Sequence, residues 1–125
     1  MQNQNAKSKT ELKYRAYQYS VKTIEFIDAL PNDASTSILA KELLRSATSI
    51  GANIIEAKGA SSKRDFTNFF TIALKSANES LYWLCLLRDA KKLKSQSLAN
   101  LLNETKELAN ILGSSILTLK GKNKF

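Results

Sequence analysis

Four stretches of this chain repeat apolar residues at intervals of three and four positions, and few residues interrupt them. Such spacing places the apolar side chains on one face of an α-helix. One proline and four glycines among 125 residues leave few points at which a helix must end. The pattern therefore predicts an all-α chain made of long amphipathic helices.

The breaks between these stretches divide the chain into predicted helices over residues 11–30, 35–58, 62–92 and 95–119. Pro31 with Asn32 and Asp33 ends the first helix, because proline disfavours helix in the residue before it. At the start of the third, Ser62 and Asp65 resemble a capping box. The predicted domain is residues 11–119, preceded by a disordered polar arm (1–10) and followed by a basic tail (120–125).

Each predicted helix has an apolar face that must be buried against the others. The expected core positions, in chain order, are Tyr17, Val21, Ile24 and Ile27; Leu43, Ala47, Ile50, Ile54 and Ala57; Phe66, Phe70, Ala73, Ala77, Leu81, Leu84 and Leu87; Leu98, Leu101, Leu108, Leu112 and either Ile116 or Leu119. Short connections make sequential helices antiparallel neighbours. The sequence thus predicts an antiparallel up-down-up-down four-helix bundle.

The second predicted helix also has a polar stripe, opposite its apolar face. Arg45, Ser49 and Asn53 follow one another at intervals of four, so they lie on one side of the helix. They are either an ordinary solvated face or a polar seam against another surface, such as a second subunit, where asparagine and serine would fix the register.

The third predicted helix is apolar on two faces. Beyond its core stripe, Ile72, Trp83 and Leu86 lie on the far side, with Tyr82 at their edge and Glu79 one turn from Trp83. A small bundle cannot bury both faces, which favours homo-oligomerisation through the second face. Glu79 is placed to pair with Arg45 of a neighbouring helix or subunit. In the alternative interpretation, loops or the terminal arm cover the patch.

The net charge of +8 is unevenly distributed along the predicted bundle. The up-down topology collects most of it at the end that holds both termini and the second connection. The candidate nucleic-acid-binding residues there are Lys13, Arg15, Lys58, Lys63, Arg64, Lys120, Lys122 and Lys124. A ring of subunits would repeat this basic end on one rim, which favours binding of RNA or DNA through phosphates. Alternatively, the basic termini only aid solubility.

Catalytic and metal chemistry find little support in this composition. The chain has no histidine, which removes the commonest general base and metal ligand. Cys85 is alone, so neither an intrachain disulfide nor a thiolate cluster is expected. No glycine-rich phosphate loop or nucleophile elbow is present. We therefore expect no metal, no cofactor and no enzymatic activity.

The N-terminus, MQNQNAKSKT, lacks the apolar core of a signal peptide. No stretch approaches the ~20 apolar residues of a membrane span. A cytoplasmic protein that does not associate with membranes is expected.

The stretch LLRSATSIGANIIEA, followed by SSKRDFTNFFTIALKSANESLYWLCLL, resembles the four helix bundle protein family. That family includes proteins encoded in intervening sequences of bacterial large-subunit ribosomal RNA genes and the accessory variability determinant of diversity-generating retroelements. The resemblance extends over about Leu12 to Leu119. Where many members have Ala-Glu-Gly, this chain has Ile55-Glu56-Ala57.

The resemblance implies a bundle that assembles into a pentameric ring with a positive surface, for which nucleic-acid binding is proposed. In the retroelement branch it also implies a reverse transcriptase as partner. For Arg45, Ser49, Asn53 and Glu79 it implies a structural or interface role, and no catalytic residue.

Together, these observations predict a non-enzymatic, homo-oligomeric, basic bundle that binds RNA or DNA, as an accessory to a reverse transcriptase or another nucleic-acid enzyme. The alternative is a protein-interaction scaffold that does not bind nucleic acid.

Overall fold

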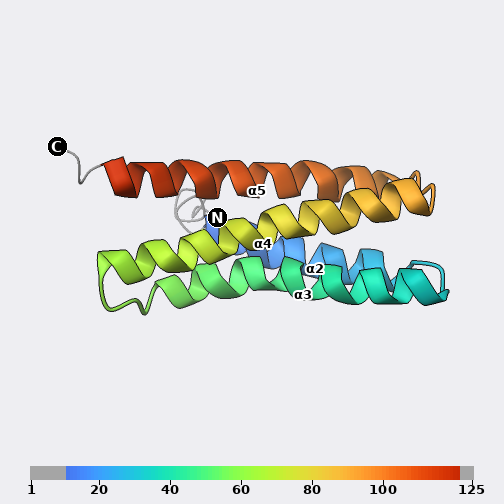
Figure 1. Ribbon diagram of the computed structural model, residues 1–125, viewed down its shortest axis with the longest axis horizontal. Helices are drawn as coiled ribbons and strands as arrows, with labels where there is room; N and C mark the ends of the chain where they lie inside the picture. The colour runs from blue at the N-terminus through green and yellow to red at the C-terminus, as the bar shows by residue number, and fades with distance from the viewer. Residues whose placement is uncertain (1–10, 122–125) are drawn as a thin grey trace, which may run out of the picture.

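The computed structural model describes residues 11–121, which form four α-helices joined by short connections (Figure 1). These are α2 (Glu11–Asp28), α3 (Ala34–Ala57), α4 (Lys63–Ala90) and α5 (Gln96–Gly121). Successive helices run in opposite directions (Figure 1). The predicted up-down-up-down bundle is confirmed, and each helix lies within a few residues of its predicted range.

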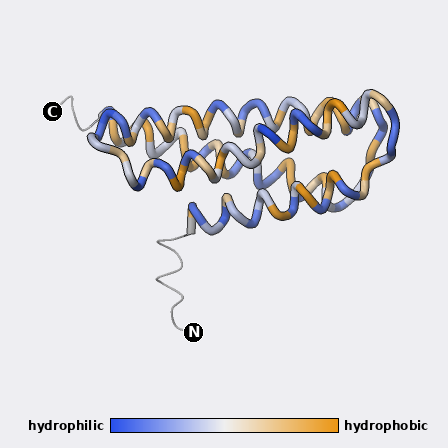
Figure 2. Tube along the Cα trace, turned by 90° about the horizontal axis from the view of Figure 1, so that it is seen from below, coloured by the Kyte–Doolittle hydropathy of each residue, from blue (hydrophilic) through white to orange (hydrophobic). Residues whose placement is uncertain are grey.

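Each helix packs against two others, in the cyclic order α2, α3, α4, α5, and among the described residues the backbones of diagonal helices do not come close to each other. Apolar residues recur in bands along all four helices (Figure 2). The expected core of α3 is buried throughout, and Leu84, Leu87, Leu108 and Leu112 are fully buried on α4 and α5. Burying these faces is the main source of stability in such a bundle.

Side chains at the connections fix where two of the helices begin. Asp33 caps α3 by accepting a hydrogen bond from the Thr36 amide at 3.0 Å, and it also pairs with Lys91 at 3.0 Å. Ser62 caps α4 by accepting from the Asp65 amide at 3.0 Å. The Asp65 carboxylate in turn accepts from the amide of Ser61 at 3.1 Å. The predicted capping box is thus present, with its return bond one residue earlier than usual.

The predicted core stripe of α2 is wrong at two of its four positions, whereas Ile27 packs against the core as predicted. Tyr17 is 64% exposed and Ile24 44% exposed, whereas Tyr19 and Phe26 are buried. The buried face also includes Ala16 and Thr23. The core side of α2 therefore contains a small residue and a polar one, whereas the prediction placed only apolar residues there. Both polar side chains are satisfied inside: the Thr23 hydroxyl donates to the Tyr19 carbonyl at 2.8 Å, and the Tyr19 hydroxyl bonds Thr105 at 2.6 Å. These bonds make burial of the more polar face possible.

Candidate nucleic-acid interface

One end of the bundle holds a basic hollow between the start of α4 and the end of α5. Lys63 and Arg64 line it from α4 and Lys120 from α5, together with Thr67 and Asn68, around a volume of about 530 Å³. The connection from α3 and the end of α5 lie at this same end (Figure 1). Two neighbouring residues of α4 and one residue near the end of α5 thus present three cationic side chains to one concavity.

The local structure keeps these cations on the surface. Lys63 and Arg64 occupy the first turn of α4, directly after the Ser62 cap, and both are exposed. Lys120 lies in the last turn of α5 and is also exposed. The acidic residue beside them, Asp65, is half-buried and holds the Ser61 amide. All three basic residues of the hollow are therefore exposed to solvent.

The other predicted basic residues divide into three groups. Lys58 is exposed at the end of α3, next to the connection that leads to Lys63. Lys13 lies beside Lys58, and the direct side-chain contact and the charge repulsion between them lower the pKa of Lys13. Lys122 and Lys124 fall outside the described residues.

Arg15 does not belong to the basic end. Its guanidinium donates to both carboxylate oxygens of Glu104, at 2.9 and 2.6 Å, and to Glu107 at 2.9 Å. These bonds raise the pKa of Arg15 and tie α2 to the middle of α5. With two carboxylates on one guanidinium, Arg15 offers no uncompensated charge to a phosphate. Arg15 therefore joins α2 to α5, and its role in nucleic-acid binding stays a prediction.

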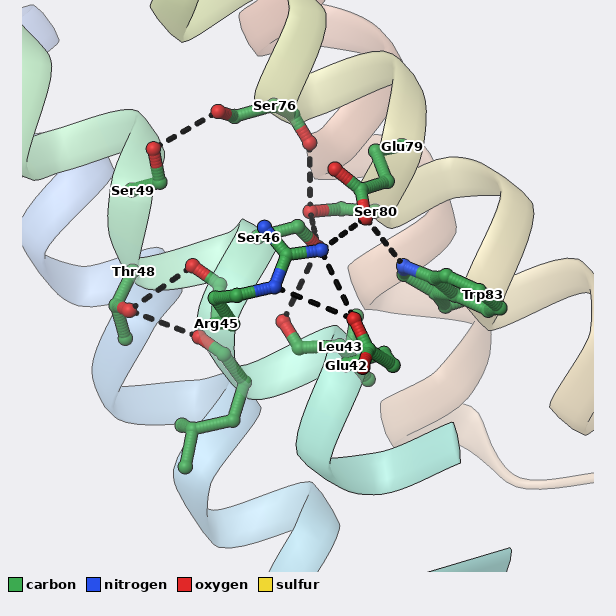
Figure 3. A network of polar contacts seen from close by, with 11 residues as sticks. Glu42, Leu43, Arg45, Ser46, Thr48, Ser49, Ser76, Glu79, Ser80 and Trp83 are labelled. Carbon is green, nitrogen blue, oxygen red and sulfur yellow. Dashed lines mark hydrogen bonds and ion pairs between the residues drawn. The ribbon is translucent and has the colours of Figure 1, made fainter. Parts of the chain in front are cut away.

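The predicted partnership of Arg45 with Glu79 occurs within the chain. Arg45 of α3 donates to Glu42 at 3.0 Å and to Glu79 of α4 (Figure 3). The same Glu79 oxygen accepts from the Trp83 indole nitrogen at 3.0 Å. Arg45 is exposed and its pKa is raised by the bonds to Glu42 and Glu79. The network fastens α3 to α4 on the outside of the bundle.

Deeper in the same seam, serine hydroxyls of α3 and α4 meet in pairs. Ser46 lies 2.8 Å from Ser80, and Ser49 lies 2.8 Å from Ser76 (Figure 3). The Asn53 amide nitrogen donates to the Ser49 hydroxyl at 3.0 Å. The polar stripe of α3 therefore forms a seam against α4 of the same chain. Neither serine of the buried Ser46–Ser80 pair was predicted, because small polar residues carry no periodic apolar signal.

The outward face of α4 is divided between exposed and covered residues. Ile72 is 44% exposed and Tyr82 58% exposed. Trp83 packs partly against the core, with its ring 5.1 Å from that of Tyr82, and Leu86 is half-buried. The surface available to another molecule is thus smaller than the sequence predicted, and it centres on Ile72 and Tyr82.

Other kinds of site were also sought in residues 11–121. No group of three or more acidic, cysteine or histidine side chains is arranged to hold a metal ion there. None of the four helices combines the length and the hydropathy needed to cross a bilayer. The lone Cys85 is half-buried on α4.

Comparison with known proteins places this fold in a family. Residues 8–114 match the 23S rRNA-intervening sequence protein family. The chain belongs to that family. A crystal structure of a protein of unknown function from the S23 ribosomal protein family of Bacteroides thetaiotaomicron has 37% sequence identity to the chain, with a TM-score of 0.77. The match covers 84% of this chain and 97% of that one. Among curated proteins, none matches the chain.

Membership of the 23S rRNA-intervening sequence protein family agrees with the resemblance found in the sequence. It accounts for the shared bundle, because the solved S23 relative superposes over nearly its whole length.

Proposed function

We propose that this member of the 23S rRNA-intervening sequence protein family is a non-enzymatic, homo-oligomeric bundle that binds nucleic acid, RNA in particular. The observation that carries the proposal is the basic hollow of Lys63, Arg64 and Lys120. Three cations on two helices converge there, and Lys58 adds a fourth at the adjoining end of α3. Such a cluster attracts the phosphate backbone at long range and releases counterions on contact.

The chemistry of the hollow favours backbone contacts over sequence reading. Lysine ammonium groups act as point charges on phosphate oxygens, while arginine can hold one bidentately. The Asn68 amide and the Thr67 hydroxyl supply further polar contacts in the same concavity. The chain has no motif known for reading bases, so affinity without strong sequence preference is expected. The reference to ribosomal RNA in the family description supports RNA as the polymer.

Self-association is the second part of the proposal. Ile72 and Tyr82 are large apolar side chains on an outward face of α4, and pairing with another copy would bury them. A ring, with five copies as the resemblance implies, would repeat the basic hollow and raise the avidity for a long polyanion without any new contact. Such a ring would present RNA to a partner enzyme, for which a reverse transcriptase is our candidate.

The test is a salt series of fluorescence anisotropy with a labelled RNA hairpin, for the parent and for the double variant Lys63→Ala/Arg64→Ala. The control is Lys41→Ala/Lys106→Ala, which removes the same charge from exposed positions outside the hollow. The logarithm of the affinity should fall with that of salt by about 0.9 per duplex phosphate neutralised. The slope should become shallower by roughly 2 in the hollow variant and change little in the control.

Two outcomes would contradict the proposal. If the parent does not bind the hairpin at low salt, the nucleic-acid function is wrong and a protein-interaction scaffold becomes the better interpretation. If both double variants lower the slope equally, binding depends on net charge and the hollow is not the site. Light scattering coupled to size exclusion, on the same samples, tests the oligomer independently.

A further inference from the structure

A second concavity, with different chemistry, lies between α2 and α3. This α2–α3 groove is lined by Lys13, Tyr14 and Tyr17 from α2 and by Gly51, Ala52 and Ile55 from α3, and its volume is about 590 Å³. Its lining is mostly apolar, although it lies on the surface. Tyr14 and Tyr17 are 54% and 64% exposed, so both rings are open to solvent.

The two tyrosines are placed as a pair. They are three residues apart on one helix, a spacing that brings side chains together on the same side. Opposite them, α3 presents Gly51 and Ala52, whose small size leaves the groove open above the point where the helices touch. A Cβ atom at Gly51 would lie 3.4 Å from the Cβ of Ala16, which shows how closely α2 and α3 approach there. A flat ring of a ligand can therefore enter the groove and stack against the tyrosine rings of α2.

Charge distinguishes this groove from an ordinary apolar patch. Lys13 lies at its edge, beside Lys58, and the contact and repulsion between the two lower the pKa of Lys13. An apolar segment of another protein lying there would bring no charge to relieve this repulsion. A phosphate group between the two ammonium groups would relieve it directly.

The groove also connects to the basic end of the molecule. Lys58 ends α3, and the next helix begins five residues later with Lys63 and Arg64 of the basic hollow. A strand lying in the groove with its phosphates toward Lys58 would therefore point to the end of the bundle that holds the hollow. Aromatic rings beside a track of cations are the usual means by which proteins hold unpaired nucleotides.

We propose that the α2–α3 groove binds a short single-stranded segment of nucleic acid, with bases stacked on Tyr14 and Tyr17 and phosphates at Lys13 and Lys58. This inference rests on the proposed function and deepens it, because it assigns unpaired nucleotides to a site separate from the basic hollow. A protein segment in the groove, including one from a second copy, is the competing occupant.

The experiment separates stacking from apolar contact. Binding of short labelled oligouridine, the matching oligodeoxythymidine and an RNA hairpin with a long paired stem and a short structured loop is measured by anisotropy for Tyr14→Leu/Tyr17→Leu and Tyr14→Phe/Tyr17→Phe. Leucine keeps the groove apolar but removes the ring, whereas phenylalanine keeps the ring. The leucine variant should bind the single strands about tenfold or more weakly, and the phenylalanine variant about as well as the parent. Comparison of the two oligomers shows whether RNA is preferred to DNA.

Controls keep the result attributable to the groove. Ile38→Ala changes an exposed apolar residue of α3, outside the groove and outside the proposed subunit contact, and should leave single-strand binding unchanged. Hairpin binding, which is assigned to the basic hollow, should be unaffected by the leucine variant. Circular dichroism of each variant verifies that the helices are intact.

The inference is overturned if the leucine variant binds oligouridine as tightly as the parent. If Lys63→Ala/Arg64→Ala still weakens hairpin binding in that case, the proposed function stands and only the groove assignment is wrong. If the parent binds neither probe, both are wrong. A protein occupant is indicated if Ala52→Asp dissociates an oligomer that the leucine variant leaves intact.

Discussion

The hydroxyl of Tyr19 lies 2.6 Å from the hydroxyl of Thr105, which joins the first described helix to the last inside the core. Thr105 in turn donates to the Leu101 carbonyl at 2.6 Å, so Tyr19 is the donor in the shared bond. Tyr19 is 1% exposed and Thr105 fully buried. The pair closes the bundle between α2 and α5.

Replacement of Tyr19 by Phe should lower the free energy of unfolding by about 1 kcal/mol at neutral pH, because one buried hydrogen bond is lost while the ring remains. Urea denaturation followed by circular dichroism measures this. A loss well above 3 kcal/mol would contradict a role limited to the hydroxyl.

Tyr19 should also make stability depend on alkaline pH. Burial raises its pKa from 10.0 to about 12. Between these values the unfolded chain loses the proton more readily, so the contribution of Tyr19 is complete below pH 10 and disappears as the pH rises toward 12. The parent should lose roughly 2–3 kcal/mol more than Tyr19→Phe over this range. Parallel stability curves for the two proteins above pH 10 would refute this.

Gly113 lies in the interior of α5, and a Cβ atom there would have no neighbour within 4 Å. Gly113→Ala should therefore raise the free energy of unfolding by about 1 kcal/mol, since alanine has the higher helix propensity. Gly51→Ala is the matched comparison, and its gain should be smaller because of the 3.4 Å approach to Ala16. Thermal denaturation of both variants ranks them, and the reverse order would be inconsistent with the packing described.

Arg15 should matter for stability and not for RNA. Arg15→Ala removes the bonds to Glu104 and Glu107 and should cost about 1 kcal/mol, as expected for a partly exposed ion pair. Its affinity for the RNA hairpin should change by less than about twofold, in contrast to Lys63→Ala/Arg64→Ala. A weakening equal to that of the double variant would return Arg15 to the nucleic-acid surface.

Trp83 is the only tryptophan, so its fluorescence reports on the α3–α4 network. Glu79→Ala deprives the indole nitrogen of its acceptor and should shift the emission maximum. Glu42→Ala removes the other carboxylate beside Arg45 and leaves the indole bond intact, so its emission should match that of the parent. Equal spectra for the two variants would show that the bond to Glu79 is absent in solution.

Self-association should depend on the exposed part of α4. Ile72→Ser/Tyr82→Ser should lower the mass measured by light scattering without loss of helix content, because both side chains are exposed in the single chain. Trp83→Ala is the less informative variant, since Trp83 packs on the core and its loss would destabilise the fold. An unchanged mass for the double variant would place the subunit contact elsewhere.

How much the sequence predicts differs between α3 and α2. On α3, Leu43, Ala47, Ile50 and Ile54 stand alone as an apolar face, so periodicity identified the core correctly. On α2, apolar residues occupy both sides, and the side that is buried includes Thr23 and Tyr19. Periodicity cannot tell which of two such faces is buried. The buried face is decided by the hydrogen-bond partner that each hydroxyl has in the folded bundle.

The candidate site, too, could be predicted from the sequence only in part. The basic end followed from topology alone, because antiparallel helices must return their termini and alternate connections to one end. Whether a particular cation is already paired did not follow, as Arg15 shows, since Glu104 is 89 residues away in sequence. The exposure of Tyr14 and Tyr17 was missed because Tyr17 was assigned to the core.

The serine pairs between α3 and α4 also bear on the handedness of the molecule. Four amphipathic helices joined by short connections can follow one another clockwise or anticlockwise around the bundle axis. Apolar faces alone distinguish these two mirror-related arrangements poorly. Ser46 meets Ser80 only when α4 lies on one particular side of α3, and reversing the circulation would separate the two hydroxyls. Two small hydroxyl groups can thus determine the handedness of the bundle, because they favour one of two topologies that the apolar pattern leaves nearly equal in energy.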